Sequence, residues 1–98
     1  MNERNSYIVS YDVCNAKRLR KVHKKMRGYG DPIQYSVFHC ELSPKQRELM
    51  IAELRAIIHN VEDRVMIVDL GPARNRGRRA IRFLGNQAKR EGDGPVVF

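Results

Sequence analysis

The sequence contains no tryptophan, only two cysteines, and no apolar run close to the roughly 20 residues needed to cross a bilayer. Its first residues, Met1-Asn2-Glu3-Arg4-Asn5, lack the apolar core of a signal peptide. Cys14 and Cys40 lack the paired spacing of a zinc site or a disulfide framework, so we expect two small, partly buried thiols. These absences predict a soluble, cytoplasmic protein without a membrane partner.

The length of 98 residues predicts one domain with a small hydrophobic core. Burial of further apolar surface between two copies would stabilise such a core, so we expect a homodimer. Pro95-Val96-Val97-Phe98 has the composition of a short terminal strand. We expect this strand to pair with an exposed sheet edge of its own chain or of the partner.

Acidic residues are absent from two segments that are rich in lysine and arginine. The chain has a formal net charge of +8, and 14 of its 19 basic residues lie within residues 15–30 and 71–90. The other residues carry 5 basic and 11 acidic side chains, so the rest of the chain is net acidic. Two cationic segments on an acidic scaffold indicate a polyanionic partner, and we expect RNA, duplex DNA or both.

Hydrophobic periodicity predicts strand, helix and strand in the first half of the chain. Residues 6–13 are apolar on both faces, as in a central strand. Asn15 can cap a helix that continues to about Arg27 and ends at the following glycines. Residues 33–42 form a second β region, either one bent strand or two short ones. Side chains in this region are expected to alternate between two faces. One face would carry Ile33, Tyr35, Val37 and His39, and the other would carry Gln34, Ser36 and Phe38.

The second half of the chain predicts a helix and further strands. Ser43-Pro44-Lys45-Gln46 combines a capping box with proline at the first helical position. Residues 64–70 form an apolar strand that Gly71-Pro72 would end, and residues 80–84 are expected to form another. The expected core face of the helix consists of Met50, Leu54, Ile57, Ile58 and Val61.

This order of elements predicts an α+β fold, a ferredoxin-like βαββαβ sandwich with an antiparallel sheet. We expect a single domain over residues 1–98. Within it, residues 71–98 would add an Arg-rich loop and a C-terminal strand.

Asp12 is the candidate catalytic and metal-binding residue, because it ends the first predicted strand on a carboxylate. Phosphodiester hydrolysis requires an activated water and neutralisation of the charge that develops on phosphate, which a carboxylate-bound Mg²⁺ or Mn²⁺ supplies. Mg²⁺ keeps several waters and needs only one or two carboxylates, so Asp12 from two symmetry-related chains would form a minimal site. Alternatively, Asp12 only terminates the strand or caps the following helix.

The candidate nucleic-acid-binding residues belong to the two cationic segments. Like charges four residues apart cost a helix about 0.2 to 0.5 kcal/mol per pair, which favours an anionic ligand over a merely solvated face. The Arg-rich loop is either solubilising or binds the nucleic-acid backbone rather than base edges, because no base-reading helix is evident. The helix group is Lys17, Arg18, Arg20, Lys21, Lys24, Lys25 and Arg27, and the loop group is Arg74, Arg76, Arg78 and Arg79.

Two aromatic residues lie near the predicted site. Tyr11 and Phe38 have rings that can stack on bases, but an aromatic residue in a strand is more often part of a core or an interface. We therefore assign both to the wall of the site or to a dimer interface. His23, His39 and His59 show no metal-ligand spacing, and only His23, on the basic helix, is a candidate for contact with phosphate.

Several motifs together resemble the family of CRISPR-associated protein two. They are Tyr7-Ile8-Val9-Ser10-Tyr11-Asp12-Val13, Lys17-Arg18-Leu19-Arg20-Lys21-Val22, Tyr29-Gly30 and Gln34-Tyr35-Ser36-Val37-Phe38. The resemblance covers roughly residues 6–71 and implies a ferredoxin-like homodimer with two Asp12 residues across the interface. It also implies a metal-dependent endonuclease and a subunit, with the CRISPR integrase, of spacer acquisition in antiviral defence.

Two hypotheses remain at this point. In the first, the chain is a Mg²⁺- or Mn²⁺-dependent endonuclease that uses Asp12 and the basic helix. In the second, the same dimer is a non-catalytic DNA-binding scaffold for the CRISPR integrase. An RNA-binding sandwich of the RRM type is more distant, because Tyr35-Ser36-Val37-Phe38 lacks the glycine-aromatic pattern of that family.

Overall fold

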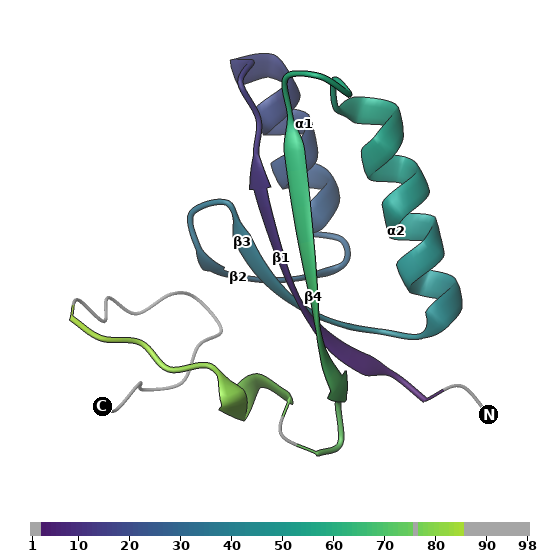
Figure 1. The fold of residues 1–98 in the computed structure, drawn as a ribbon, viewed down its shortest axis with the longest axis vertical. Helices are drawn as coiled ribbons and strands as arrows, with labels where there is room; N and C mark the ends of the chain where they lie inside the picture. Colours follow the sequence, from purple (N-terminus) through teal and green to yellow (C-terminus); the bar gives the residue numbers. More distant parts are fainter. Residues whose placement is uncertain (1–2, 76, 86–98) are drawn as a thin grey trace.

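The structure, a computed structural model, describes residues 3–75 and 77–85 as a four-stranded sheet with two α-helices and a short 3-10 helix (Figure 1). The elements in chain order are β1 (Asn5–Asp12), α1 (Ala16–Met26), β2 (Gly30–Gln34), β3 (Val37–Leu42), α2 (Pro44–Ile57), β4 (Arg64–Pro72) and η1 (Gly77–Ala80). The predicted α+β class and ferredoxin-like order are confirmed. Neither helix in these residues has the length and apolarity to cross a membrane.

The sheet has the order β2-β3-β1-β4, and each neighbouring pair is antiparallel. The prediction that the first strand is central is confirmed, because β1 pairs with β3 on one side and β4 on the other. In these ladders Tyr7 lies opposite Cys40, and Asp12 lies opposite Arg64. Among the residues that the structure describes, the edge strands are β2 and β4.

Both helices pack on the same face of the sheet, and the hydrophobic core lies between the two layers (Figure 1). Side chains alternate along a strand, so Tyr7, Val9 and Tyr11 of β1 all enter this core. The other core members are Val13, Val22, Met26, Phe38, Cys40, Leu42, Met50 and Leu54. The expectation for Val61 is wrong: α2 ends at Ile57, and Val61 lies in the following turn with 87 % of its surface exposed.

Both predicted helix caps are present. The Asn15 side chain accepts a hydrogen bond of 2.9 Å from the backbone N–H of Arg18. Ser43 and Gln46 form the reciprocal capping box at the start of α2, with Pro44 as its first residue. These caps satisfy backbone N–H groups that a helix leaves unpaired at its N-terminus, so they place both helix starts.

The β region of residues 33–42 is resolved as two strands joined at Tyr35 and Ser36. Ser36 has a φ of 64°, in the left-handed region that favours glycine. This turn interrupts the alternation expected from the sequence, so Tyr35 is exposed rather than aligned with buried Ile33. At the other end of β2, a Cβ on Gly30 would lie 2.3 Å from the carbonyl oxygen of His39. Glycine therefore allows β2 to approach β3 closely at this position.

The chain beyond residue 70 departs from two expectations. Gly71-Pro72 does not end the strand, because β4 continues to Pro72, which pairs with Asn5, and Gly71 tolerates a φ of 89°. The strand expected at residues 80–84 is wrong: η1 occupies Gly77–Ala80, and residues 81–84 have no regular structure. Pro95-Val96-Val97-Phe98 lies outside the described residues.

Candidate functional site

Asp12 is the last residue of β1, and its side chain is exposed. Because Tyr11 enters the core, Asp12 lies on the other face of the sheet, which carries neither α-helix. Within the described part of the chain, the Asp12 carboxylate forms no hydrogen bond or ion pair. The helix-cap alternative is also not found, because Asn15 caps α1. Both carboxylate oxygens of Asp12 are therefore available to a ligand.

One chain supplies too few ligands for a complete metal site. Residues 3–75 and 77–85 contain no group of three or more His, Cys, Asp or Glu residues that could hold a metal ion. Hard oxygen donors suit Mg²⁺ and Mn²⁺, and Mg²⁺ retains several waters. The exposed Asp12 carboxylate therefore fits such an ion if a second chain contributes its own Asp12.

An apolar strip lies beside Asp12 on the same face of the sheet. Met66 and Val68 of β4 lie opposite Ser10 and Ile8 of β1, in register with the Asp12–Arg64 pair. Met66 is 53 % exposed and Val68 is 38 % exposed. Two adjacent apolar residues at this exposure, next to a single carboxylate, are suited to contact with another protein surface.

The exposed side of α1 forms a basic face, which we define as Lys17, Arg20, Lys21, Lys24 and Arg27. Its members recur at intervals of three and four residues, while Val22 and Met26 are buried on the opposite side of the helix. None of these five cations forms an ion pair with an acidic side chain among the residues that the structure describes. The basic face can therefore meet a polyanion without first losing an internal partner.

Arg18 and Lys25, also predicted to bind nucleic acid, are instead paired within the chain. Arg18 Nε donates to Asp63 at 2.8 Å, and Arg18 Nη2 donates to Glu62 at 3.0 Å. Lys25 Nζ lies 3.8 Å from a carboxylate oxygen of Glu53. The sequence did not reveal these partners, because they come from α2 and the loop after it, more than 25 residues away.

Asp63 fastens the loop after β1 to the loop after α2. Its buried carboxylate accepts hydrogen bonds from Arg18, from the backbone N–H of Cys14 at 2.9 Å and from that of His59 at 2.8 Å. The Arg18 hydrogen bonds hold the pKa of Asp63 well below its ordinary value; burial opposes this, and the two backbone donors add to it. Asp63 therefore stabilises the loop that follows Asp12.

The lowered pKa predicts a contribution to stability that depends on pH. Asp63 stabilises the fold above its unfolded-state pKa, near 3.8, and this contribution is lost as the pH falls toward its lower folded-state pKa. We expect Asp63→Asn to be less stable than wild type at pH 7 and to lose less stability between pH 5 and pH 2, measured by urea unfolding. Glu62→Gln is the control, because Glu62 pairs with the same arginine but is exposed. Equal acid dependence in wild type and Asp63→Asn would contradict the prediction.

The two aromatic candidates differ from expectation in their exposure. Phe38 is completely buried, so the assignment of its side chain to a site wall or an interface is wrong, and it belongs to the core. Tyr11 is 5 % exposed, stacks on Phe38 and is hydrogen bonded to His23 Nδ1 at 3.0 Å. Burial, with a contribution from nearby Tyr35, raises the pKa of Tyr11 to about 12. Tyr11 is therefore a neutral, anchored residue.

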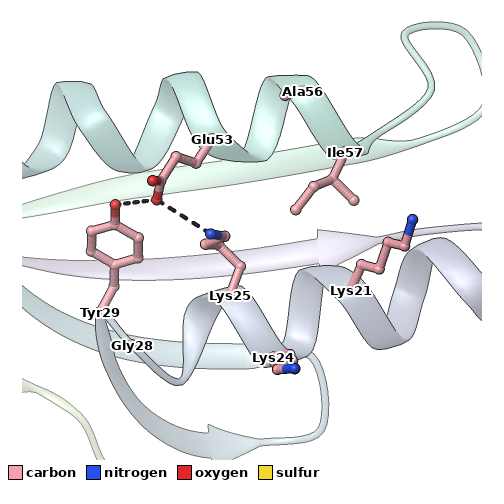
Figure 2. A pocket seen from close by; sticks show the side chains of 8 residues that line it. All are labelled: Lys21, Lys24, Lys25, Gly28, Tyr29, Glu53, Ala56 and Ile57. Atoms are coloured by element: carbon pink, nitrogen blue, oxygen red, sulfur yellow. Dashed lines mark hydrogen bonds and ion pairs between the residues drawn. The ribbon is translucent and has the colours of Figure 1, made fainter.

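A hollow of about 820 Å³ lies between α1 and α2 (Figure 2). Lys25 and Tyr29 both point toward Glu53, and the Tyr29 hydroxyl donates to the Glu53 carboxylate (Figure 2). Burial, and then the interaction with Glu53, raises the pKa of Tyr29 to about 12. The carboxylate in this hollow makes it less suited to anions than its lysines alone suggest.

A second hollow, of about 620 Å³, lies between α1 and the β2–β3 turn. No acidic residue lines it. The sequence did not single out Tyr35 or Ser36 as site residues, because only the turn between the two short strands brings them to α1. The lining residues are Tyr11, Leu19, Arg20, His23, Lys24, Arg27, Tyr35 and Ser36.

The Arg-rich loop is less free than the basic face. Arg74 forms an ion pair with Glu3, and the Arg79 guanidinium donates to the backbone carbonyl of Asn75. Arg78 falls within η1, and Arg76 lies outside the described residues. The predicted role of this loop in nucleic-acid binding therefore remains a prediction that rests on its sequence.

The family described as CRISPR associated protein Cas2 matches residues 5–78. A Rhodospirillum rubrum protein named CRISPR-associated endoribonuclease Cas2 1 is 43 % identical over 72 residues, covering 74 % of this chain and 71 % of the relative. A Geobacter sulfurreducens protein named CRISPR-associated endoribonuclease Cas2 is 46 % identical over 69 residues, covering 70 % of this chain and 73 % of the relative. The crystal structure of Streptococcus pyogenes Cas2 superposes with a TM-score of 0.72 at 33 % identity, covering 82 % of this chain and 99 % of that one.

Proposed function

This chain belongs to the family of CRISPR-associated protein Cas2, and we propose that it is a metal-dependent endonuclease that hydrolyses phosphodiester bonds of RNA or DNA. We further propose that it acts as a homodimer in the spacer-acquisition complex, together with the CRISPR integrase. The names of the two bacterial relatives support the nuclease activity. The observation that carries the proposal is the exposed, unpaired Asp12 carboxylate at the end of a central strand.

The proposed catalytic site is built from two copies of the same strand end. In each chain Asp12 would be one ligand of the ion. The hydrogen bonds of Asp63 to Arg18 and to the backbone N–H of Cys14 would keep the loop after β1 in place. When bound, Mg²⁺ or Mn²⁺ supplies Lewis-acid stabilisation of the charge that develops on phosphate and lowers the pKa of a coordinated water. The strip of Met66 and Val68 would pack against the partner and bring the two carboxylates together.

The basic face would hold the substrate through its phosphates. Its five unpaired cations contact an anionic backbone regardless of base identity, so this surface supports binding of either RNA or duplex DNA. α1 begins four residues after Asp12, so the start of the basic face lies at the same end of the sheet as the proposed metal site.

A non-catalytic DNA-binding scaffold for the integrase is the alternative. It is favoured by one observation: the basic face is intact in a single chain, whereas the described residues of that chain hold no complete metal-ligand group. On this alternative, Asp12 would be structural or vestigial. Loss or retention of cleavage on replacement of Asp12 separates the two functions.

The shared site requires a dimer through the sheet face that carries Asp12. We expect wild type to sediment as a dimer and Met66→Glu to sediment as a monomer, because dimerisation would bury an unpaired charge. Cleavage should fall at least tenfold with the dimer, since neither chain alone completes the metal site. Leu49→Glu is the matched control, because Leu49 on α2 is 54 % exposed against 53 % for Met66.

The outcomes of this experiment are distinct. A Met66→Glu variant that remains dimeric would show that the interface lies elsewhere on the molecule. A monomeric wild type that still cleaves would contradict the proposal that two chains share one metal site.

A further inference from the structure

The hollow between α1 and the β2–β3 turn has the chemistry of a nucleotide site, and we call it the Tyr35 pocket. Arg20, Lys24 and Arg27 of the basic face line one side of it. Tyr35, 78 % exposed, lines the side formed by the turn, and Tyr11 and His23 also contribute to its walls. Its volume of about 620 Å³ lies in the ordinary range of small-ligand pockets.

The Tyr35 pocket differs in charge from the hollow between the two helices. The latter contains Glu53, which holds Lys25 and Tyr29. The Tyr35 pocket is lined by three cations and no carboxylate. It therefore favours an anion, and the tyrosine ring adds a surface for a flat aromatic group.

The turn that presents Tyr35 is held in place. The backbone N–H of Tyr11 donates to the carbonyl oxygen of Ser36 at 3.1 Å, which ties the turn to the end of β1. Tyr11 is fixed on the other side by its hydrogen bond to His23 of α1. The two walls of the pocket are thus joined through one buried residue, so the pocket does not depend on a ligand to form.

We propose that the Tyr35 pocket accepts one unpaired nucleotide of the bound nucleic acid, with its base on the Tyr35 ring and its phosphate on the cations of Arg20, Lys24 and Arg27. The proposal rests on the proposed nucleic-acid binding by the basic face and adds recognition of a base that has left the duplex. Base stacking on an aromatic side chain is favourable and tolerates any sequence, because every base has a flat aromatic face. A fully paired duplex has no base to offer, so it gains nothing from the pocket.

The test compares two duplexes of the same sequence, one fully paired and one with a single bulged 2-aminopurine, made as DNA and as RNA. We expect wild type to bind the bulged form at least about fivefold more tightly and to quench the 2-aminopurine fluorescence. Tyr35→Ala should lose both the preference and the quenching while it keeps its affinity for the paired duplex. Tyr35→Phe retains the ring and should behave as wild type. The high exposure of Tyr35 makes both variants compatible with folding.

The outcomes separate this inference from the proposed function. Equal wild-type affinity for the two duplexes would contradict the proposal that the Tyr35 pocket accepts an unpaired nucleotide. It would leave the proposed nucleic-acid binding by the basic face in place. No binding of either duplex at low salt would overturn both. Saturation of the pocket by free AMP at micromolar concentration, dependent on Tyr35, would make it a site for free nucleotides and overturn the assignment to a strand.

Discussion

Asp12→Asn is expected to reduce metal-stimulated cleavage of RNA or DNA by about 100-fold or more. The amide has one oxygen and no negative charge, so it is a poor ligand for Mg²⁺ or Mn²⁺. Metal ions provide several kcal/mol of transition-state stabilisation, and each 1.36 kcal/mol corresponds to a tenfold change in rate. The measurement is the initial rate of cleavage of labelled RNA and DNA at saturating Mg²⁺ or Mn²⁺.

Two controls define what Asp12→Asn changes. The dimer and its affinity for nucleic acid should remain, because Asp12 has no partner in the described fold and is not part of the basic face. Asp69→Asn is the matched variant, because it removes a second exposed carboxylate. The Asp69 carboxylate accepts hydrogen bonds from the Asn5 side chain and from the backbone N–H of Gly71. It should cleave as wild type does. Cleavage by Asp12→Asn at the wild-type rate would favour the scaffold function.

The double variant Lys17→Gln, Lys21→Gln on the basic face is expected to bind duplex DNA more weakly. Its affinity should also depend less on salt concentration. Each lost phosphate contact lowers the slope of log affinity against log salt concentration by about 0.9, so the double variant should lose about 1.8. The loss should be the same for unrelated sequences, because contacts to phosphate carry no base information. Both lysines lie outside the Tyr35 pocket, so this experiment does not depend on that inference.

The control for net charge is the double variant Lys45→Gln, Arg55→Gln. Both residues are exposed on α2, and the change in total charge is identical. We expect its salt slope to stay close to wild type. If the two double variants have equal slopes, the α1 lysines have no special role, and the basic face is a solvated surface.

Local chemistry was sufficient to predict much of this fold. Asn15 and Ser43 cap the two helices as expected, because capping depends on side chains within three residues of the helix start. The apolar run before Asp12 occupies the centre of the sheet, and its residues Tyr7, Val9 and Tyr11 enter the core because side chains alternate along a strand. The ferredoxin-like order followed from these elements.

Predictions failed where backbone geometry overrode periodicity. The turn at Tyr35 and Ser36 broke the alternation expected for one β region, so exposed Tyr35 and buried Phe38 were both misplaced. Gly71 can adopt a positive φ, which allowed β4 to continue through a pair of residues that usually ends a strand. In both cases a residue with a positive φ, Ser36 or Gly71, changed where a strand ends.

The sequence by itself determined the class of fold, the concentration of positive charge in α1 and the position of Asp12 at a strand end, because these depend on residues that are neighbours in the chain. Only the tertiary structure decided which charges are available. It paired Arg18 with Asp63 and Lys25 with Glu53, left Lys17, Arg20, Lys21, Lys24 and Arg27 exposed, and placed Tyr35 beside three of the exposed cations. The physical reason is that ion pairs and pockets form between segments far apart in the chain, and their distances are set by the packing of the two helices and the β2–β3 turn.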